Sequence, residues 1–145
     1  PLAIQLGLLE SLKRQALLAM GHAQAAHGAK LNDNQDAMGL MADLASELFA
    51  VESGLVRADR MARQGHRWAG FARDCAELYL NHALGKVAAD ARALLTEVLE
   101  GEALEGALRE LAAHDRHAAT PGSRLRDRIA TQLIEQGKYP IDLAG

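Results

Sequence analysis

Apolar residues recur every three or four positions through a long stretch in the middle of the chain. They are Leu40, Leu44, Leu48, Val51, Leu55, Ala58 and Ala62. This spacing keeps side chains on one face of an α-helix, whereas a strand would place alternate residues on one face. A second stripe flanks the first and consists of Met38, Ala45, Phe49 and Val56. Because each stripe needs a partner, we expect two helices to pack against this one. It is therefore the expected central helix of the fold.

The composition favours helices elsewhere in the chain as well. Alanine supplies 29 of the 145 residues, proline only 3, and aromatic residues 3%, a balance typical of close-packed helices rather than strands. A chain of this length buries about two thirds of its unfolded surface and needs no cross-links to fold. We expect a single all-α domain over residues 1–145, an up-and-down bundle of three long and about two shorter helices.

Local signals place the first three helices. The first is expected from Leu2 to about His27, and Asn32, Asp33 or Asn34 can cap the second. Two glycines and three cations at 63–70 indicate a helix connection. A third helix is then expected from about Trp68 to Leu99.

The remaining helices are shorter. Gly101 is expected to break the third helix, and a fourth ends near His114. Thr120 is the expected cap of a last helix, with Pro121 at its first helical position. That helix stops at Gly137, and the tail, 138–145, is expected to be extended by Pro140.

Charge and cysteine content narrow the class of protein. The single cysteine, Cys75, cannot form an intrachain disulfide, and no apolar run approaches the roughly 20 residues needed to span a bilayer. We expect a cytoplasmic protein, and a processed or excised chain because it begins with Pro1. The net charge of −3 does not predict nucleic-acid binding, which needs a concentrated basic surface rather than a near-neutral mixture of charges.

Glu52 falls between the two apolar stripes of the second helix and is therefore expected to be buried. A carboxylate there could be a general base, a metal ligand or half of an ion pair. Candidate partners lie on the last helix and are Arg124, Arg126 and Arg128. We expect a structural ion pair or a hydrogen-bonded carboxylate rather than a catalytic group.

Metal centres have little support in the sequence. No glutamate is followed by histidine three residues later, the spacing that di-iron bundles use. His114 and His117 lie close to Asp115 and Glu110, where they could line up beside a metal, but two histidines in one polar segment are typical of a solvated helix end. We assign no metal ligand.

"NHALGKV" at 81–87 faintly resembles the "HxLKG" of histidine phosphotransfer bundles, with glycine and lysine in swapped order. His82 would then be the phosphate acceptor. Its helical face is shared with Trp68, Cys75, Leu78 and Tyr79. That sector favours a core or boundary histidine, and an unreactive buried thiol at Cys75.

The sequence shows no Gly-rich phosphate loop and no serine nucleophile elbow. Five arginines surround the second helix connection and could form a basic patch, although such runs are usually solvated: Arg57, Arg60, Arg63, Arg67 and Arg73. From the residues alone we assign no catalytic, cofactor-binding or metal-binding position.

Two segments carry a family resemblance, "NDNQDAMGLMADLASELFAVESGLVRADRM" at 32–61 and "RLRDRIATQLIEQGKYPIDL" at 124–143. They resemble the C-terminal helical extension of acyl-CoA dehydrogenases, in particular the very-long-chain branch. The resemblance runs from roughly Leu12 to Ile141. It implies a parent flavoenzyme that uses FAD to convert a fatty acyl-CoA to the trans-2-enoyl product.

The resemblance also implies that this chain is itself non-catalytic. The family's catalytic glutamate lies in a Tyr-Glu-Gly motif upstream of the extension, and the chain contains no such motif, so Glu52 does not match it. The resemblance further implies an extension that folds back on the catalytic core of its own chain, accompanies a homodimer and contacts a membrane peripherally. An apolar docking patch is expected to include Leu2, Leu6 and Leu9. The alternative is a stand-alone interaction or phosphotransfer module with His82 as acceptor.

Overall fold

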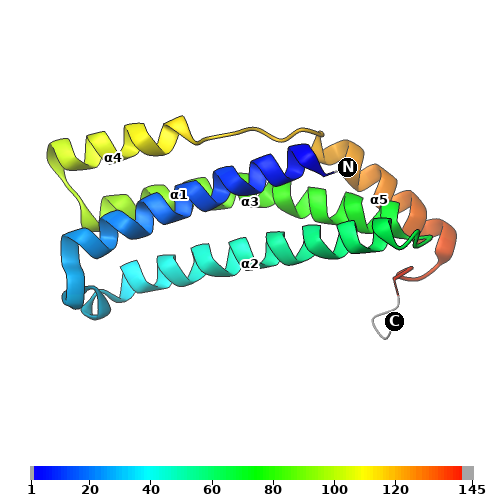
Figure 1. Cartoon of the computed structure of the whole chain (residues 1–145), viewed down its shortest axis with the longest axis horizontal. Coiled ribbons are helices and arrows are strands. Elements are labelled where there is room, and N and C mark those ends of the chain that lie inside the picture. The colour runs from blue at the N-terminus through cyan, green and yellow to red at the C-terminus, as the bar shows by residue number, and fades with distance from the viewer. Residues whose placement is uncertain (1, 142–145) are drawn as a thin grey trace.

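The computed structural model describes residues 2–141, which form five α-helices, three of them long (Figure 1). The helices are α1 (Ala3–His27), α2 (Gln35–Arg63), α3 (Ala69–Val98), α4 (Gly101–Ala113) and α5 (Gly122–Gln136). A short 3-10 helix, η1 (Gly28–Asp33), joins α1 to α2. The prediction of an all-α helical bundle is confirmed.

Helix ends follow the local signals in most places. The Asn34 side chain accepts a hydrogen bond of 3.0 Å from the Ala37 amide, which caps α2. Gly137 ends α5 in the left-handed region with φ of 65°. The prediction that Thr120 caps the last helix is wrong, because α5 begins one residue later than expected, after Pro121. The Thr120 carbonyl instead accepts a hydrogen bond of 2.7 Å from Asn81 of α3.

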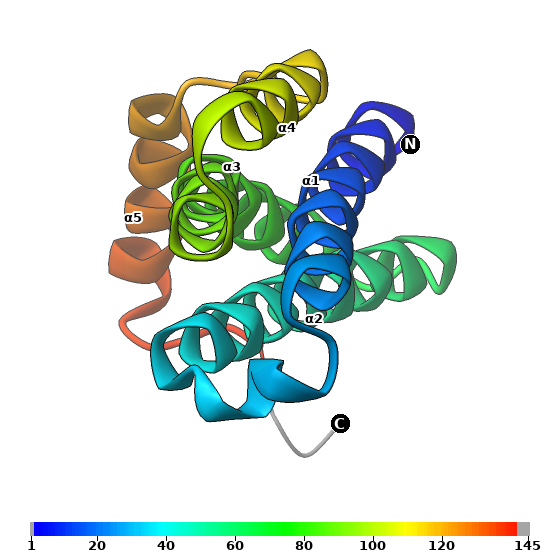
Figure 2. The same cartoon turned by 90° about the vertical axis from the view of Figure 1, so that its left-hand side faces the viewer.

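The central helix is α3, which packs against α1, α2, α4 and α5 (Figure 2). The sequence had placed α2 in that position, and this expectation is wrong. The first stripe of α2 is largely buried, but the second stays open: Phe49 is 75% exposed and Val56 60%. An apolar stripe shows which surface a helix can bury and does not show that a partner covers it.

The segment after α5 turns back toward the bundle. Pro140 and Ile141 lie in bends, so the expected extended tail is not found over 138–141, and Ile141 is buried at 7% exposure. The rest of that expectation, 142–145, lies outside the described residues. Within residues 2–141, no helix has the length and apolarity required to cross a membrane.

Candidate functional site

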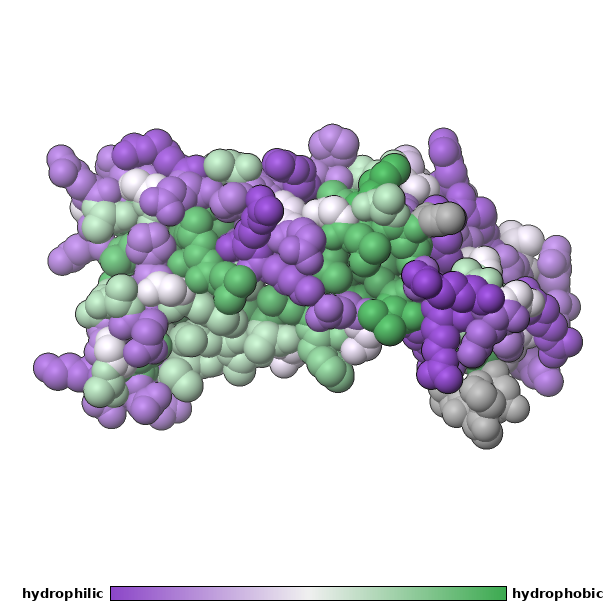
Figure 3. All heavy atoms as spheres, viewed as in Figure 1, coloured by the Kyte–Doolittle hydropathy of each residue, from purple (hydrophilic) through white to green (hydrophobic). Residues whose placement is uncertain are grey.

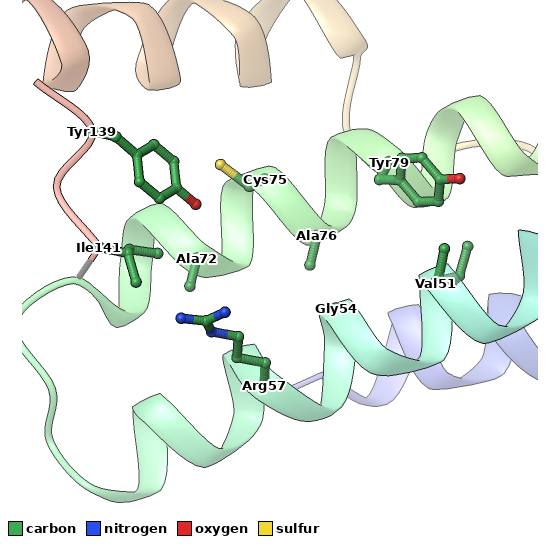
Figure 4. A pocket seen from close by; sticks show the side chains of 10 residues that line it. Val51, Gly54, Arg57, Ala72, Cys75, Ala76, Tyr79, Tyr139 and Ile141 are labelled. Atoms are coloured by element: carbon green, nitrogen blue, oxygen red, sulfur yellow. The ribbon is translucent and has the colours of Figure 1, made fainter. Parts of the chain in front are cut away.

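A cavity of about 300 Å³ lies between α2, α3 and the segment after α5 (Figure 4). Three parts of the chain line it: Ala50, Val51, Gly54 and Arg57 from α2, Ala72, Cys75, Ala76 and Tyr79 from α3, and Tyr139 and Ile141. This volume is at the lower end of the range typical of small-molecule sites. No pattern in the sequence predicted this cavity.

Small residues on the facing helices leave this space open. A Cβ atom placed on Gly54 would lie 3.6 Å from the Cβ of Ala76, so α2 and α3 approach closely at this point. Ala50 and Ala72 line the same groove. Because none of these side chains extends beyond a methyl group, none fills the outer part of the groove.

The segment 139–141 forms one wall of the cavity. The Tyr139 ring meets the Phe71 ring edge-on, with centroids 5.6 Å apart and an interplanar angle of 73°. Phe71 is 1% exposed, so Tyr139 rests on a residue of the core. Tyr139 follows the last helix in a segment without apolar periodicity. The sequence signal that could have shown this packing is the aromatic residue before Pro140 and the apolar residue after it.

The polar groups of the cavity gather at one end. Figure 4 shows the Arg57 guanidinium and the Tyr139 hydroxyl directed toward the same space beside Ala72. The five arginines near the α2–α3 connection are all exposed, as expected of a solvated run. Arg63 pairs with Asp59 at 2.6 Å, and Arg67 lies over the Trp68 ring at 5.3 Å.

Cys75 is half-buried and lines the cavity from α3. Burial raises the pKa of its thiol, and the nearby Asp74 carboxylate raises it further, because both disfavour the thiolate. The thiol is therefore protonated at neutral pH and is a weak nucleophile there.

The rate of Cys75 alkylation is expected to rise with pH, with a midpoint above that of an exposed cysteine. Burial and the Asp74 charge both disfavour the thiolate. Rates with an uncharged maleimide across a pH series measure this midpoint. The D74N variant removes the negative charge and should move the midpoint down. A midpoint equal to that of a short cysteine peptide would contradict the burial argument.

Glu52 is exposed and forms an ion pair with Lys13 of α1, with 2.9 Å between Oε1 and Nζ. This hydrogen bond raises the pKa of Lys13. The expected burial and the expected arginine partner on the last helix are wrong. Since the stripe containing Phe49 and Val56 is uncovered, Glu52 lies at the rim of the α1–α2 contact. An ion pair at Glu52 is therefore found, with a partner on α1.

Arg128 of α5 pairs with a different carboxylate. Its guanidinium donates to both oxygens of Asp74, at 2.6 and 2.9 Å, and the Asp74 side chain is 12% exposed. Glu77, one turn further along α3, is 3% exposed, and its Oε1 has no hydrogen-bond partner. Sequence reasoning missed both acids because it followed only the apolar residues of α3.

His82 is exposed on α3, so the expectation of a core or boundary position is wrong. Its ring lies beside Tyr79, with centroids 5.9 Å apart. The Lys86 amine donates to Asp90 at 2.6 Å, so this lysine is committed to a partner on its own helix. His82 lies at the edge of the expected apolar face, beyond the sector that neighbouring helices cover.

The polar residues around His114 do not converge on one point. The His114 carbonyl accepts hydrogen bonds from Ser11 and Gln15 of α1. Glu110 lies beside His22 of α1, with 3.9 Å between its Oε2 and the histidine Nε2. Over residues 2–141 no group of three or more His, Cys, Asp or Glu side chains is placed to hold a metal ion.

The five helices of residues 2–141 and the groove between α2 and α3 identify the class of protein as an all-α helical bundle. Residues 11–112 match the family described as "Acyl-CoA dehydrogenase, C-terminal domain". The chain therefore belongs to the acyl-CoA dehydrogenase C-terminal domain family.

Two relatives extend this comparison. The chain is 26% identical over 140 residues to a "Probable acyl-CoA dehydrogenase" of Bacillus subtilis, covering 92% of this chain and 23% of the relative. It also superposes, with a TM-score of 0.90 and 25% identity, on an acyl-CoA dehydrogenase from Bacillus anthracis solved in complex with FAD. That match covers 97% of this chain and 24% of the other. The chain thus spans about a quarter of the length of both.

Proposed function

We propose that this chain is the non-catalytic assembly domain of a longer FAD-dependent acyl-CoA dehydrogenase that oxidises fatty acyl-CoA to trans-2-enoyl-CoA. The family match and the two much longer relatives support this, as does the absence of a Tyr-Glu-Gly motif from the sequence. The motifs at 32–61 favour the very-long-chain branch, and the single cysteine favours the cytoplasm. The proposed partners are the catalytic core of its own chain and, in the parent, a second subunit.

An exposed apolar face carries this proposal. It consists of Leu6 and Leu17 of α1 with Phe49 and Val56 of α2, which are 49%, 67%, 75% and 60% exposed, and we name it the α1/α2 face. The Lys13–Glu52 pair joins the same two helices. Figure 3 shows hydrophobic surface over α1 and α2 on both sides of a hydrophilic band.

Large apolar side chains exposed together on one face, on either side of an ion pair, favour an interaction site there. The docking patch expected from the sequence needs one correction, because Leu9 is 2% exposed and belongs to the core. Leu6 remains available, and α2 supplies the other half of the face. We therefore propose that the α1/α2 face contacts the catalytic core.

The docking test compares the full-length parent with the 145-residue chain. We expect F49D to change the stability of the chain alone by no more than about 0.5 kcal/mol, because Phe49 is exposed there. In the parent the same variant should lower the melting temperature and expose the domain to limited proteolysis, since a charge would be buried without a partner. The matched control is I134D on α5, where the native side chain is 80% exposed. Equal effects of F49D on parent and isolated chain would refute docking through this face.

The parent activity has its own test. Anaerobic addition of a long-chain acyl-CoA to the full-length protein should bleach a bound-flavin spectrum, while the 145-residue chain should show no flavin band. A parent without flavin would overturn the dehydrogenase proposal whatever the docking variants show.

A further inference from the structure

The cavity between α2 and α3 has a polar end with two hydrogen-bond donors. Arg57 and Tyr139 approach this end from opposite walls (Figure 4). The ion pairs among residues 2–141 join other side chains and leave the Arg57 guanidinium without a carboxylate. A guanidinium beside a hydroxyl donor suits an anion, and a carboxylate can accept from both donors at once.

The rest of the cavity is apolar. Four of the lining residues have hydrocarbon side chains: Val51, Ala72, Ala76 and Ile141. The Tyr79 hydroxyl donates to Glu47 at 2.9 Å, so this residue offers its ring to the groove while its polar atom is already paired. A ligand lying along the groove therefore meets a positive charge at one end and hydrocarbon along its length.

We propose that this cavity binds an aliphatic monocarboxylate, with the carboxylate at Arg57 and Tyr139 and the unbranched chain between α2 and α3. One guanidinium matches one negative charge, and the volume of about 300 Å³ suits a small ligand rather than a folded partner. The site is separate from the α1/α2 face, so its test does not depend on the proposed docking.

Cys75 provides a reporter inside the cavity, because it is the single cysteine of the sequence. Decanoate is the probe, and the measurement is the rate at which N-ethylmaleimide alkylates Cys75 in the 145-residue chain. We expect decanoate to slow the reaction to a saturable limit, and titration calorimetry to give the same dissociation constant. Decanol, which lacks the charge, should protect much more weakly.

Paired arginine variants test the polar end. R57Q should weaken decanoate binding about tenfold, because a charge-assisted hydrogen bond is lost. R60Q is the matched control: it removes an exposed arginine of α2 that does not line the cavity, and should leave the dissociation constant unchanged.

The apolar end is tested by A72L, which places a larger side chain in the groove and should abolish protection of Cys75 by decanoate. Circular dichroism establishes that A72L is folded, and R57Q tests the proposal independently because Arg57 is a surface residue. Three results would each overturn the proposal. These are an absence of protection below the concentration at which decanoate forms micelles, equal protection by decanol, and equal weakening by R57Q and R60Q.

Discussion

Replacement of Phe71 by alanine is expected to lower the free energy of unfolding by about 3–5 kcal/mol. Phe71 is 1% exposed within the core, near the start of the helix on which the other four pack. The variant loses the transfer free energy of a buried ring and leaves a void that the neighbouring helices fill only partly. Urea denaturation followed by far-ultraviolet circular dichroism measures the loss.

Tyr139 offers a matched comparison, because its ring is the other half of the same aromatic pair. Since Tyr139 is 54% exposed, Y139A should cost only about 1 kcal/mol. Both variants should speed the alkylation of Cys75, because both release the wall formed by 139–141. If F71A were no more destabilising than Y139A, Phe71 would not be the anchor of that wall.

Replacement of Leu125 by alanine is expected to weaken the docking of α5 by about 2–5 kcal/mol. Leu125 is fully buried, yet it lies outside the continuous apolar cluster shared by the other helices. The Arg128 pair with Asp74 also holds α5, and Ile129 and Leu133 pack partly buried against the core. Because α3 is the single helix that α5 contacts within residues 2–141, we expect α5 to detach while α1 to α4 remain folded.

Hydrogen exchange distinguishes local detachment from global unfolding. In L125A the amides of α5 should exchange at least about thirtyfold faster, while those of α3 around Leu94 keep their protection. I134A is the control, because that side chain is exposed and its truncation removes no buried contact. Uniform acceleration across all helices would show that α5 unfolds together with the rest of the bundle.

Helix positions were predictable because they depend on local signals. The expected first helix, from Leu2 to about His27, differs from α1 by one residue, and Asn34 was among the expected caps of α2. How those helices pack was harder to predict from the sequence. Phe49 and Val56 have the spacing of core residues, and only the three-dimensional arrangement shows that no helix of residues 2–141 covers them.

The candidate site depended on information that periodicity does not carry. Its open space arises where Gly54 and Ala76 come into register across two helices, and one wall comes from a segment after the last helix. Glu52 shows the same limit for charges. Its pairing was expected from its place on the helix, but its partner, Lys13, depends on how α1 lies against α2.

The connection between α4 and α5 is held at both ends by side chains from other helices. The side chains of Ser11 and Gln15 donate hydrogen bonds to the His114 carbonyl, and the Asn81 side chain donates one to the Thr120 carbonyl. The five residues between these anchors, 115–119, are all exposed. A reporter sequence inserted there would lengthen a loop whose ends are already fixed, and the entropy of closing a loop grows slowly with its length. This connection is therefore the place at which the bundle can carry an added segment without disturbing its helices.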